Sequence, residues 1–284
     1  NPVVCPTQDM VIGSYWLTLS RAGEKGEGMI FSSEDEMLKA YEMGIIEVHA
    51  RVKMRVEKMW QGKKVSKLIE TTPGLVIFNK SIPQDLGYKD RNNYDELFEL
   101  EIDSLVGKDK LGKIVHQCFK RYGATETSII LDKIKKTGFH YSTKSAISIA
   151  VSDIVVPEKK KGLLAQAEEK VQKAEKQYRR GLISEDERYK RITNVWKVTG
   201  DEITAELKAV MDKYNTIFMI ADSGARGSMK QIAQLGGMRG LMANPSGKII
   251  EIPIKANFSE GLTVLEFFIS THGTRKGLAD TALK

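Results

Sequence analysis

The sequence predicts an α+β chain whose second half contains a long antiparallel helical hairpin. Three observations lead to this prediction: period-two alternation near residue 50, coiled-coil spacing of apolar residues between residues 158 and 214, and an ordinary globular composition. Of the 284 residues, 41% are hydrophobic and 29% are charged, which is typical of a globular domain. No apolar run approaches the roughly 18 residues of a membrane span, and no secretory signal pattern is present. We therefore expect a soluble, cytoplasmic chain without a membrane partner.

Residues 1–103 are predicted to mix short helices with a small sheet. Tyr15–Leu19 is expected to form a strand or a short helix. Ser32 and Ser33 followed by acidic residues supply N-cap chemistry for a helix that stops at Gly44. Val48–Val56 alternates with period two, as a half-buried strand does, and its expected partner is Lys64–Glu70 across a turn at residues 61–62. Leu75–Phe78 is a further apolar run.

Residues 105–139 are predicted to form two helical segments that divide at Gly123. Ile129, Ile130 and Ile134 fall on one face of the second segment, as an amphipathic helix requires. The stretch Ser145–Val156 is rich in β-branched residues and ends before a proline.

Residues 157–214 carry the clearest structural signal, since apolar or small residues recur there at alternating threes and fours, the spacing of a coiled-coil seam. Only Gly181–Ile183 separates the two periodic stretches, so the helices must run antiparallel, and Ser184 with Glu187 forms a capping box for the second one. The charged residues off the seam favour a projecting arm over a hairpin buried on a core. The seam positions are Leu164, Ala167, Val171, Ala174, Tyr178, Tyr189, Ile192, Trp196, Thr199, Ile203 and Val210.

Residues 215–284 change character again. Ile217–Ile220 is predicted to be a short strand that leads into Asp222–Ser228, where two glycines, two hydroxyls and an arginine fit either a phosphate site or a tight turn. A hairpin turning at Asn244–Gly247 is expected next, and then a helix that starts at Ser259. This helix contains Gly273 and Gly277. Since each costs about 1 kcal/mol relative to alanine, close approach by another group or backbone flexibility is expected there.

The function classes are narrowed by charge and by motifs. A formal net charge of +7 favours polyanionic partners, and a generic basic nucleic-acid binder is one alternative. Two distant cysteines and four scattered histidines argue against a disulfide scaffold or a zinc site. The HExxH, GxSxG and Asp-x-Asp-x-Asp motifs are absent, as is a Walker loop, so no set of residues in this chain is expected to run a complete reaction alone.

Three long motifs resemble the β′ subunit family of bacterial multisubunit RNA polymerases. Ala221–Ser228 and Gly237–Ala243 are similar to its F-loop region, and Phe267–Lys284 to the start of its bridge helix. Shorter matches follow the order of that family along the rest of the chain: Pro6–Asp9, Lys25–Gly28, His49–Arg51, Thr71–Thr72, Val76–Asn79, Thr137–Phe139 and Val156–Lys160. The chain begins without methionine and is expected to be a segment of something larger.

The resemblance implies DNA-templated RNA synthesis by two Mg²⁺ ions, with nucleoside triphosphates entering through a secondary channel. The aspartate motif that holds the metals in the family is absent, so this segment should be inert alone and bind no metal. Implied partners are the β, α, ω and sigma subunits, template DNA, RNA, nucleoside triphosphates and Gre-type cleavage factors, in the cytoplasm at the nucleoid. The family often has an arginine after Thr-Thr-x-Gly, where this chain has Leu75.

The resemblance also implies residue roles and a division of the chain. Residues 1–156 correspond to a pore or funnel region, 157–214 to a rim coiled coil, and 215–284 to the F-loop and bridge-helix start. Contacts to nucleotides or nucleic acid near the active centre are expected at Gln8, Arg226, Arg239, His272, Arg275, Lys276, Thr281 and Lys284. Factor docking is expected at the hairpin tip, on Leu182, Ile183, Glu187, Lys190, Arg191 and Asn194. The alternative is an autonomous regulator-binding module that acts through the coiled coil.

Overall fold

The computed structural model describes residues 4–244 and 246–283, and these residues form two compact units. The first unit is Asn1–Ser148 together with Met219–Arg226, and the second is Ile149–Phe218 together with Gly227–Lys284. Both helices and a three-stranded sheet are present, so the predicted α+β class is confirmed. No described helix is long and apolar enough to cross a membrane.

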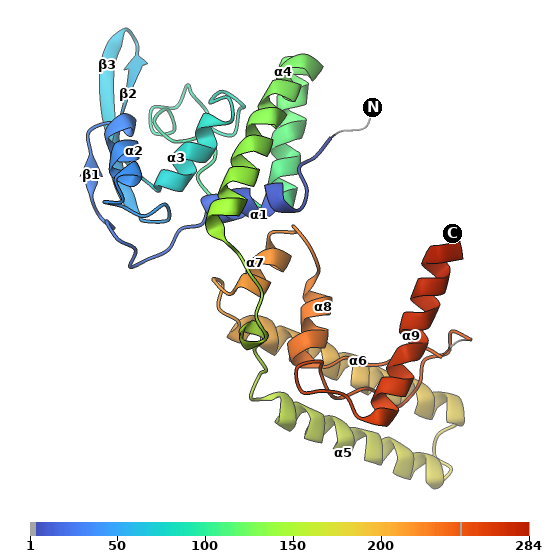
Figure 1. Ribbon diagram of the computed structural model, residues 1–284. Coiled ribbons are helices and arrows are strands. Elements are labelled where there is room, and N and C mark those ends of the chain that lie inside the picture. Colours follow the sequence, from blue (N-terminus) through green and yellow to red (C-terminus); the bar gives the residue numbers. More distant parts are fainter. Residues whose placement is uncertain (1–3, 245, 284) are drawn as a thin grey trace. The chain divides into compact units, whose positions relative to one another are not determined.

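The first unit combines the small sheet with a long, bent helix (Figure 1). The sheet order is β1-β2-β3, with β1 parallel and β3 antiparallel to β2. Gln61 and Gly62 both have positive φ, which is the geometry of a type I′ hairpin turn, so the predicted hairpin is confirmed. The elements are α1 (Asp9–Leu17), β1 (Ile30–Phe31), α2 (Glu34–Glu42), β2 (Val52–Trp60), β3 (Lys63–Thr71), α3 (Pro73–Lys80) and α4 (Lys108–Ser145).

Local chemistry explains why two apolar runs are helices. Thr72 accepts a hydrogen bond from the amide of Leu75 and Pro73 occupies the first helical position, so the run at residues 75–78 becomes α3. The predicted strand at residues 217–220 is wrong. Asn215 accepts from the amides of Ile217 and Phe218 and so starts a short helix there instead.

Helix α4 is bent where the sequence predicts a break, because Gly123 has φ 74° and divides it into two segments. Helix α1 crosses the second segment at two glycines. A Cβ on Gly13 would lie 1.9 Å from the carbonyl oxygen of Gly138, and one on Gly138 would lie 2.7 Å from that of Met10. The two backbones are therefore in direct contact, and any larger side chain would separate them.

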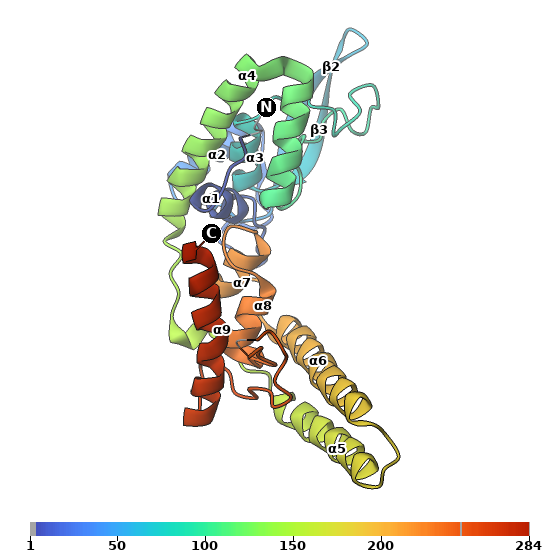
Figure 2. The same ribbon diagram turned by 90° about the vertical axis from the view of Figure 1, so that its right-hand side faces the viewer.

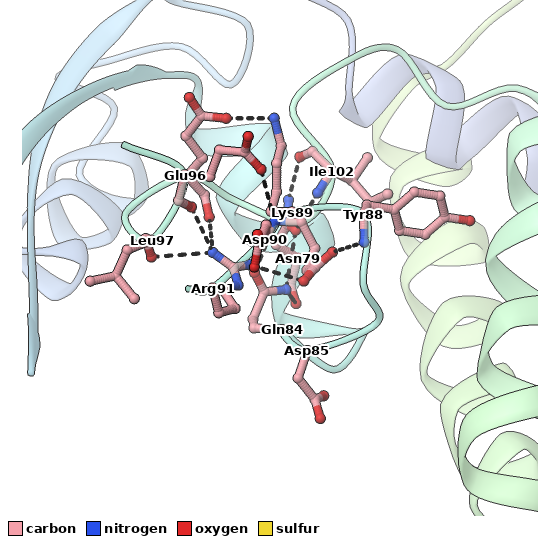
Figure 3. Close-up of polar contacts among 12 residues, drawn as sticks. Asn79, Gln84, Asp85, Tyr88, Lys89, Asp90, Arg91, Glu96, Leu97 and Ile102 are labelled. Carbon is pink, nitrogen blue, oxygen red and sulfur yellow. Dashed lines mark hydrogen bonds and ion pairs between the residues drawn. The ribbon is translucent and has the colours of Figure 1, made fainter. Parts of the chain in front are cut away.

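The segment 81–107 contains no helix or strand, and polar side chains hold it in place (Figure 3). Arg91 donates to the carbonyls of residues 96, 97 and 99, and to the fully buried carboxylate of Glu101 at 3.1 Å. Asn79 brackets Ile102, donating to its carbonyl (2.7 Å) and accepting from its amide (3.1 Å). Buried backbone groups that have no sheet or helix partner are thus satisfied by side chains.

The second unit is built around an antiparallel helix pair (Figure 2). Ala167 and Ala174 face Ile192, Trp196 and Ile203 in its core, as the seam predicts. The two terminal seam positions, Tyr178 and Val210, are exposed, and Leu207 is buried instead. The elements are η1 (Val151–Asp153), α5 (Lys160–Arg179), α6 (Glu185–Val210), α7 (Thr216–Asp222, which the division between the units crosses), α8 (Met229–Ile232), η2 (Ala233–Gly237) and α9 (Val264–Leu283).

The connecting segment between η2 and α9 lies along the helix pair. Two isolated antiparallel bridges, Gly240 with Ile254 and Ala243 with Ile249, give it the form of the expected hairpin. Arg188 on α6 makes a two-bond ion pair with Glu251, at 2.7 and 3.0 Å. The connecting segment therefore covers one side of the α5–α6 helix pair nearly to the tip of that pair.

The glycine contact between α1 and α4 makes a stability prediction. Gly13→Ala should lower the free energy of unfolding by about 1–3 kcal/mol or more, because the added methyl group overlaps a carbonyl. Gly112→Ala, in the long helix α4 with nothing within 4 Å of the added Cβ, should be neutral or stabilising by up to about 1 kcal/mol. Urea unfolding followed by circular dichroism measures both, and equal effects would contradict the packing argument.

His49 makes a pH prediction. Burial lowers the pKa of its imidazole, which lies 2.8 Å from the carbonyl of Trp16 through Nε2. Below about pH 6.5, the ordinary histidine pKa, the unfolded chain takes up a proton that the folded chain resists, so stability falls as the pH drops. His49→Gln should show a smaller loss of melting temperature between pH 7.5 and 5.5. A loss equal to that of the parent chain would contradict a role for His49.

Candidate functional site

The turn at residues 222–226 follows α7 and is seated on the first unit. The phenol of Tyr15 donates to Asp222 Oδ2 at 2.8 Å, and the amide of Lys108 donates to the carbonyl of Ser223 at 2.8 Å. Gly224 has φ 72°, and a Cβ there would lie 3.1 Å from Cβ of Lys108. A glycine is thus required for both the turn and the contact.

The backbone amides of this turn are already used. Those of residues 223, 224 and 226 donate to carbonyls of α7, and that of Ala225 donates to Oγ of Ser223. The sequence fits either a phosphate site or a tight turn here. The backbone forms a tight turn, because its amides are bonded within the chain and do not converge on a ligand. The Arg226 side chain is exposed, and it is the group in this turn that can meet an anion.

A hollow of about 300 Å³ lies beside this turn, lined by Tyr15, Asp222, Ser223 and the start of α4. Burial, and then the hydrogen bond to Asp222, raises the pKa of Tyr15 far above its ordinary value. Burial also lowers the pKa of the Lys110 ammonium at the same hollow. With its pKa raised, the phenol of Tyr15 stays protonated and can donate the hydrogen bond to Asp222.

Gln8 lies directly before α1 in the same unit. Its carbonyl accepts from the amides of Val11 (2.9 Å) and Ile12 (3.0 Å), while its side chain is exposed. Its backbone has φ 47° and ψ −117°, a conformation that few non-glycine residues adopt. Helix α1 thus supports Gln8 at one end and, through Tyr15, the turn that ends at Arg226.

Arg239 belongs to the second unit and is partly buried. Its guanidinium lies 4.6 Å from the ring centroid of Phe258, and Nη1 donates to Gln234 Oε1 at 3.1 Å. Burial lowers the pKa of Arg239, and no ion pair joins it to any described carboxylate. Its charge is held in place by an aromatic ring and an amide and is left available to an external anion. Neither Phe258 nor Gln234 carries a recognisable signal in the sequence.

Helix α9 begins later than predicted, at Val264. Thr263 and Glu266 cap it reciprocally, whereas Ser259 and Glu260 belong to a separate turn around Asn257. The prediction of a start at Ser259 is therefore wrong, because the Thr263 cap lies four residues further along. The apolar side chains of Val264, Leu265, Phe267, Phe268 and Leu278 are exposed.

Four predicted contact residues lie on the described part of α9. Arg275, Lys276 and Thr281 are exposed, and the ring of His272 packs edge to face with that of Phe268 at 5.2 Å. A Cβ on Gly273 would meet Cε of Met242 at 2.7 Å, whereas one on Gly277 would meet nothing within 4 Å. Close approach thus accounts for the first glycine alone. Lys284 lies outside the described residues.

The hairpin tip presents some of its predicted docking residues and engages others. Leu182, Lys190 and Asn194 are exposed, and Ile183 is half-buried. Glu187 is part of the capping box with Ser184, and Arg191 donates to Gln177 Oε1 at 2.8 Å. The last two residues therefore hold the hairpin together as well as facing solvent. Elsewhere in the chain, Leu75 occupies the position at which the family often has an arginine, and its side chain is buried.

No group of three or more His, Cys, Asp or Glu residues that could hold a metal ion occurs within residues 4–244 and 246–283. The residues present therefore do not fit a two-metal centre, whose ions need several carboxylate ligands.

The chain matches two protein-family models. Residues 1–154 match the family model "RNA polymerase Rpb1, domain 3", and residues 183–259 match "RNA polymerase Rpb1, domain 4". The chain therefore belongs to the RNA polymerase Rpb1 family.

The relatives narrow the class to bacterial β′ subunits. Over all 284 residues the chain is 61% identical to the DNA-directed RNA polymerase subunit beta' of Clostridium novyi, 59% to that of Caldicellulosiruptor saccharolyticus and 58% to that of Caldanaerobacter subterraneus. The resemblance inferred from the motifs is thereby confirmed over the whole chain. The chain spans 24% of the length of each of these relatives.

The capping box at the hairpin tip makes a prediction. Ser184→Ala should destabilise α6 by about 1 kcal/mol, because the amide of Glu187 loses its acceptor. Ser184→Asp keeps an acceptor and should stay near the parent value. Hydrogen exchange at residues 184–190 measures the effect locally, and unchanged exchange in the alanine variant would show that the cap contributes nothing.

Proposed function

We propose that this chain serves as part of the β′ subunit of a bacterial DNA-dependent RNA polymerase, in the wall of the channel through which nucleoside triphosphates enter. The observation that carries the proposal is the match over all 284 residues at up to 61% identity, which includes the long motif on α9. Nucleotidyl transfer is then an activity of the assembled enzyme. Its Mg²⁺ ligands belong to other residues, and the segment alone is inert.

Within that enzyme, we assign 1–156 to the funnel, 157–214 to the rim coiled coil, and 215–284 to the F-loop and the start of the bridge helix. Arg226, Arg239 and Gln8 meet nucleotide phosphates, and the basic residues of α9 face nucleic acid. The exposed guanidinium of Arg226 supports anion contact, and so does the guanidinium of Arg239, which forms no ion pair with a described carboxylate. An Arg fork suits phosphate because it donates two parallel hydrogen bonds.

The exposed apolar residues of α9 are buried by contact with the other subunits (β, α, ω and sigma), since exposed patches of this kind mark interaction surfaces. Such an assembly works on DNA and RNA in the cytoplasm. The alternative, an autonomous regulator-binding module, draws support from the hairpin tip alone and leaves the two arginines and α9 without a role.

Gre-type factors dock at the tip of the α5–α6 hairpin, on Leu182, Lys190 and Asn194. In polymerase reconstituted with a full-length β′ chain that carries this segment, Lys190→Glu should weaken binding of such a factor by about fivefold or more, as loss of a charge contact with a reversed sign implies. Fluorescence anisotropy with labelled factor measures the affinity.

Lys208→Glu is the matched control, because it makes the same charge change five turns further along α6 on the same face, about 27 Å away. It should leave the affinity within about twofold of the parent value. Equal losses in both variants would indicate a diffuse charge effect and would remove the tip from the proposal.

A further inference from the structure

The hydrogen bond between Tyr15 and Asp222 joins two segments that lie more than 200 positions apart in the sequence. We propose that Tyr15 is a positioning residue for nucleotide addition, holding the 222–226 turn so that Arg226 points at the incoming nucleotide. The inference rests on the proposed function, because it gives Arg226 the phosphate contact assigned above.

The donor of this hydrogen bond is buried and the acceptor is exposed. Tyr15 is 3% exposed within α1, and α1 is in backbone contact with α4 through Gly13. Asp222 is exposed at the end of α7. The buried phenol is therefore the anchored partner, and it restrains a carboxylate that is otherwise exposed to solvent. Burial raises the pKa of the phenol, so Tyr15 remains a hydrogen-bond donor to Asp222.

The position of Asp222 is transmitted to Arg226 through the backbone. The amide of Arg226 donates to the carbonyl of Ile220 at 3.3 Å, and that of Gly224 donates to the carbonyl of Ala221 at 3.1 Å. The last turn of α7 and Arg226 therefore form one hydrogen-bonded unit, with Asp222 inside it. If the end of α7 frays, Arg226 moves with it.

The remaining anchors of the turn act after Asp222. Lys108 holds the carbonyl of Ser223, and Ala225 packs against the core of the first unit. These contacts fix the centre of the turn, and Tyr15 adds a side-chain anchor at Asp222, in the last turn of α7. Loss of the phenolic hydroxyl should thus leave the fold intact while widening the range of Arg226 positions.

Steady-state single-nucleotide addition by polymerase reconstituted with full-length β′ tests the inference. Tyr15→Phe should raise KM for the incoming nucleotide by about threefold to tenfold and leave kcat within about twofold, the pattern of lost binding. Asp222→Ala should do the same, whereas Asp222→Asn keeps an oxygen acceptor and should stay close to the parent enzyme.

The matched control is Tyr122→Phe, which removes a similar hydrogen bond between a tyrosine and an aspartate, Asp85, elsewhere in the first unit. It should leave KM unchanged. A rise in KM equal to that of Tyr15→Phe would overturn the inference, because both variants would then be acting through general stability.

Arg226→Ala separates this inference from the proposed function. If it raises KM, then Tyr15→Phe combined with Arg226→Ala should be no worse than Arg226→Ala alone, since a positioning residue acts only through the group it positions. If Arg226→Ala raises KM and Tyr15→Phe does not, the positioning role is overturned and the phosphate contact stands. If Arg226→Ala leaves KM unchanged, the phosphate contact itself is overturned, and the positioning role falls with it.

Discussion

The contact between Gly13 and Gly138 is the constraint on which the first unit depends. It brings the backbones of α1 and α4 together with no side chain between them. Helix α1 and its C-cap then carry several long-range hydrogen bonds: Tyr15 donates to Asp222, the Thr18 hydroxyl accepts from the amide of Val106, and the carbonyl of Trp16 bonds with His49. A shift of α1 would disturb all three together. The predicted contact residue Gln8 and the turn before Arg226 share this one support.

Side chains substitute for regular structure at two places in the chain. In the first unit, Arg91 and Glu101 hold the segment 81–107, which has neither helix nor strand. In the second, Asn257 donates to the carbonyls of Gly236 and Gly237, and the nearly buried Lys160 pairs with Glu260. A buried charge is tolerated only with a partner, so these pairs fix one conformation of segments that backbone hydrogen bonding leaves open.

In the second unit, neutral groups hold the Arg239 side chain. Arg239 is desolvated, stacked on Phe258 and bonded to a neutral amide, with no described carboxylate in ion-pair contact. Desolvation strengthens its attraction for a phosphate, because charges interact more strongly at low dielectric. Arg226 is the opposite case, an exposed side chain whose backbone is held. Each belongs to its own unit, and each is constrained by a different kind of contact.

Periodicity and capping are local properties, so the sequence by itself determined the α+β class, the hairpin strands around Gln61-Gly62, the break at Gly123, the seam from Ala167 to Ile203 and the family motifs. Short apolar runs are ambiguous because four residues fit a strand or one helical turn equally well. The sequence accordingly predicts a strand at residues 217–220 where a helix forms, and it places the start of α9 five residues too early. Only the tertiary structure decided that Tyr15 reaches Asp222, that Phe258 carries Arg239 and that Glu251 meets Arg188. These contacts join residues up to 207 positions apart, and no local preference encodes which distant side chain fills a given place.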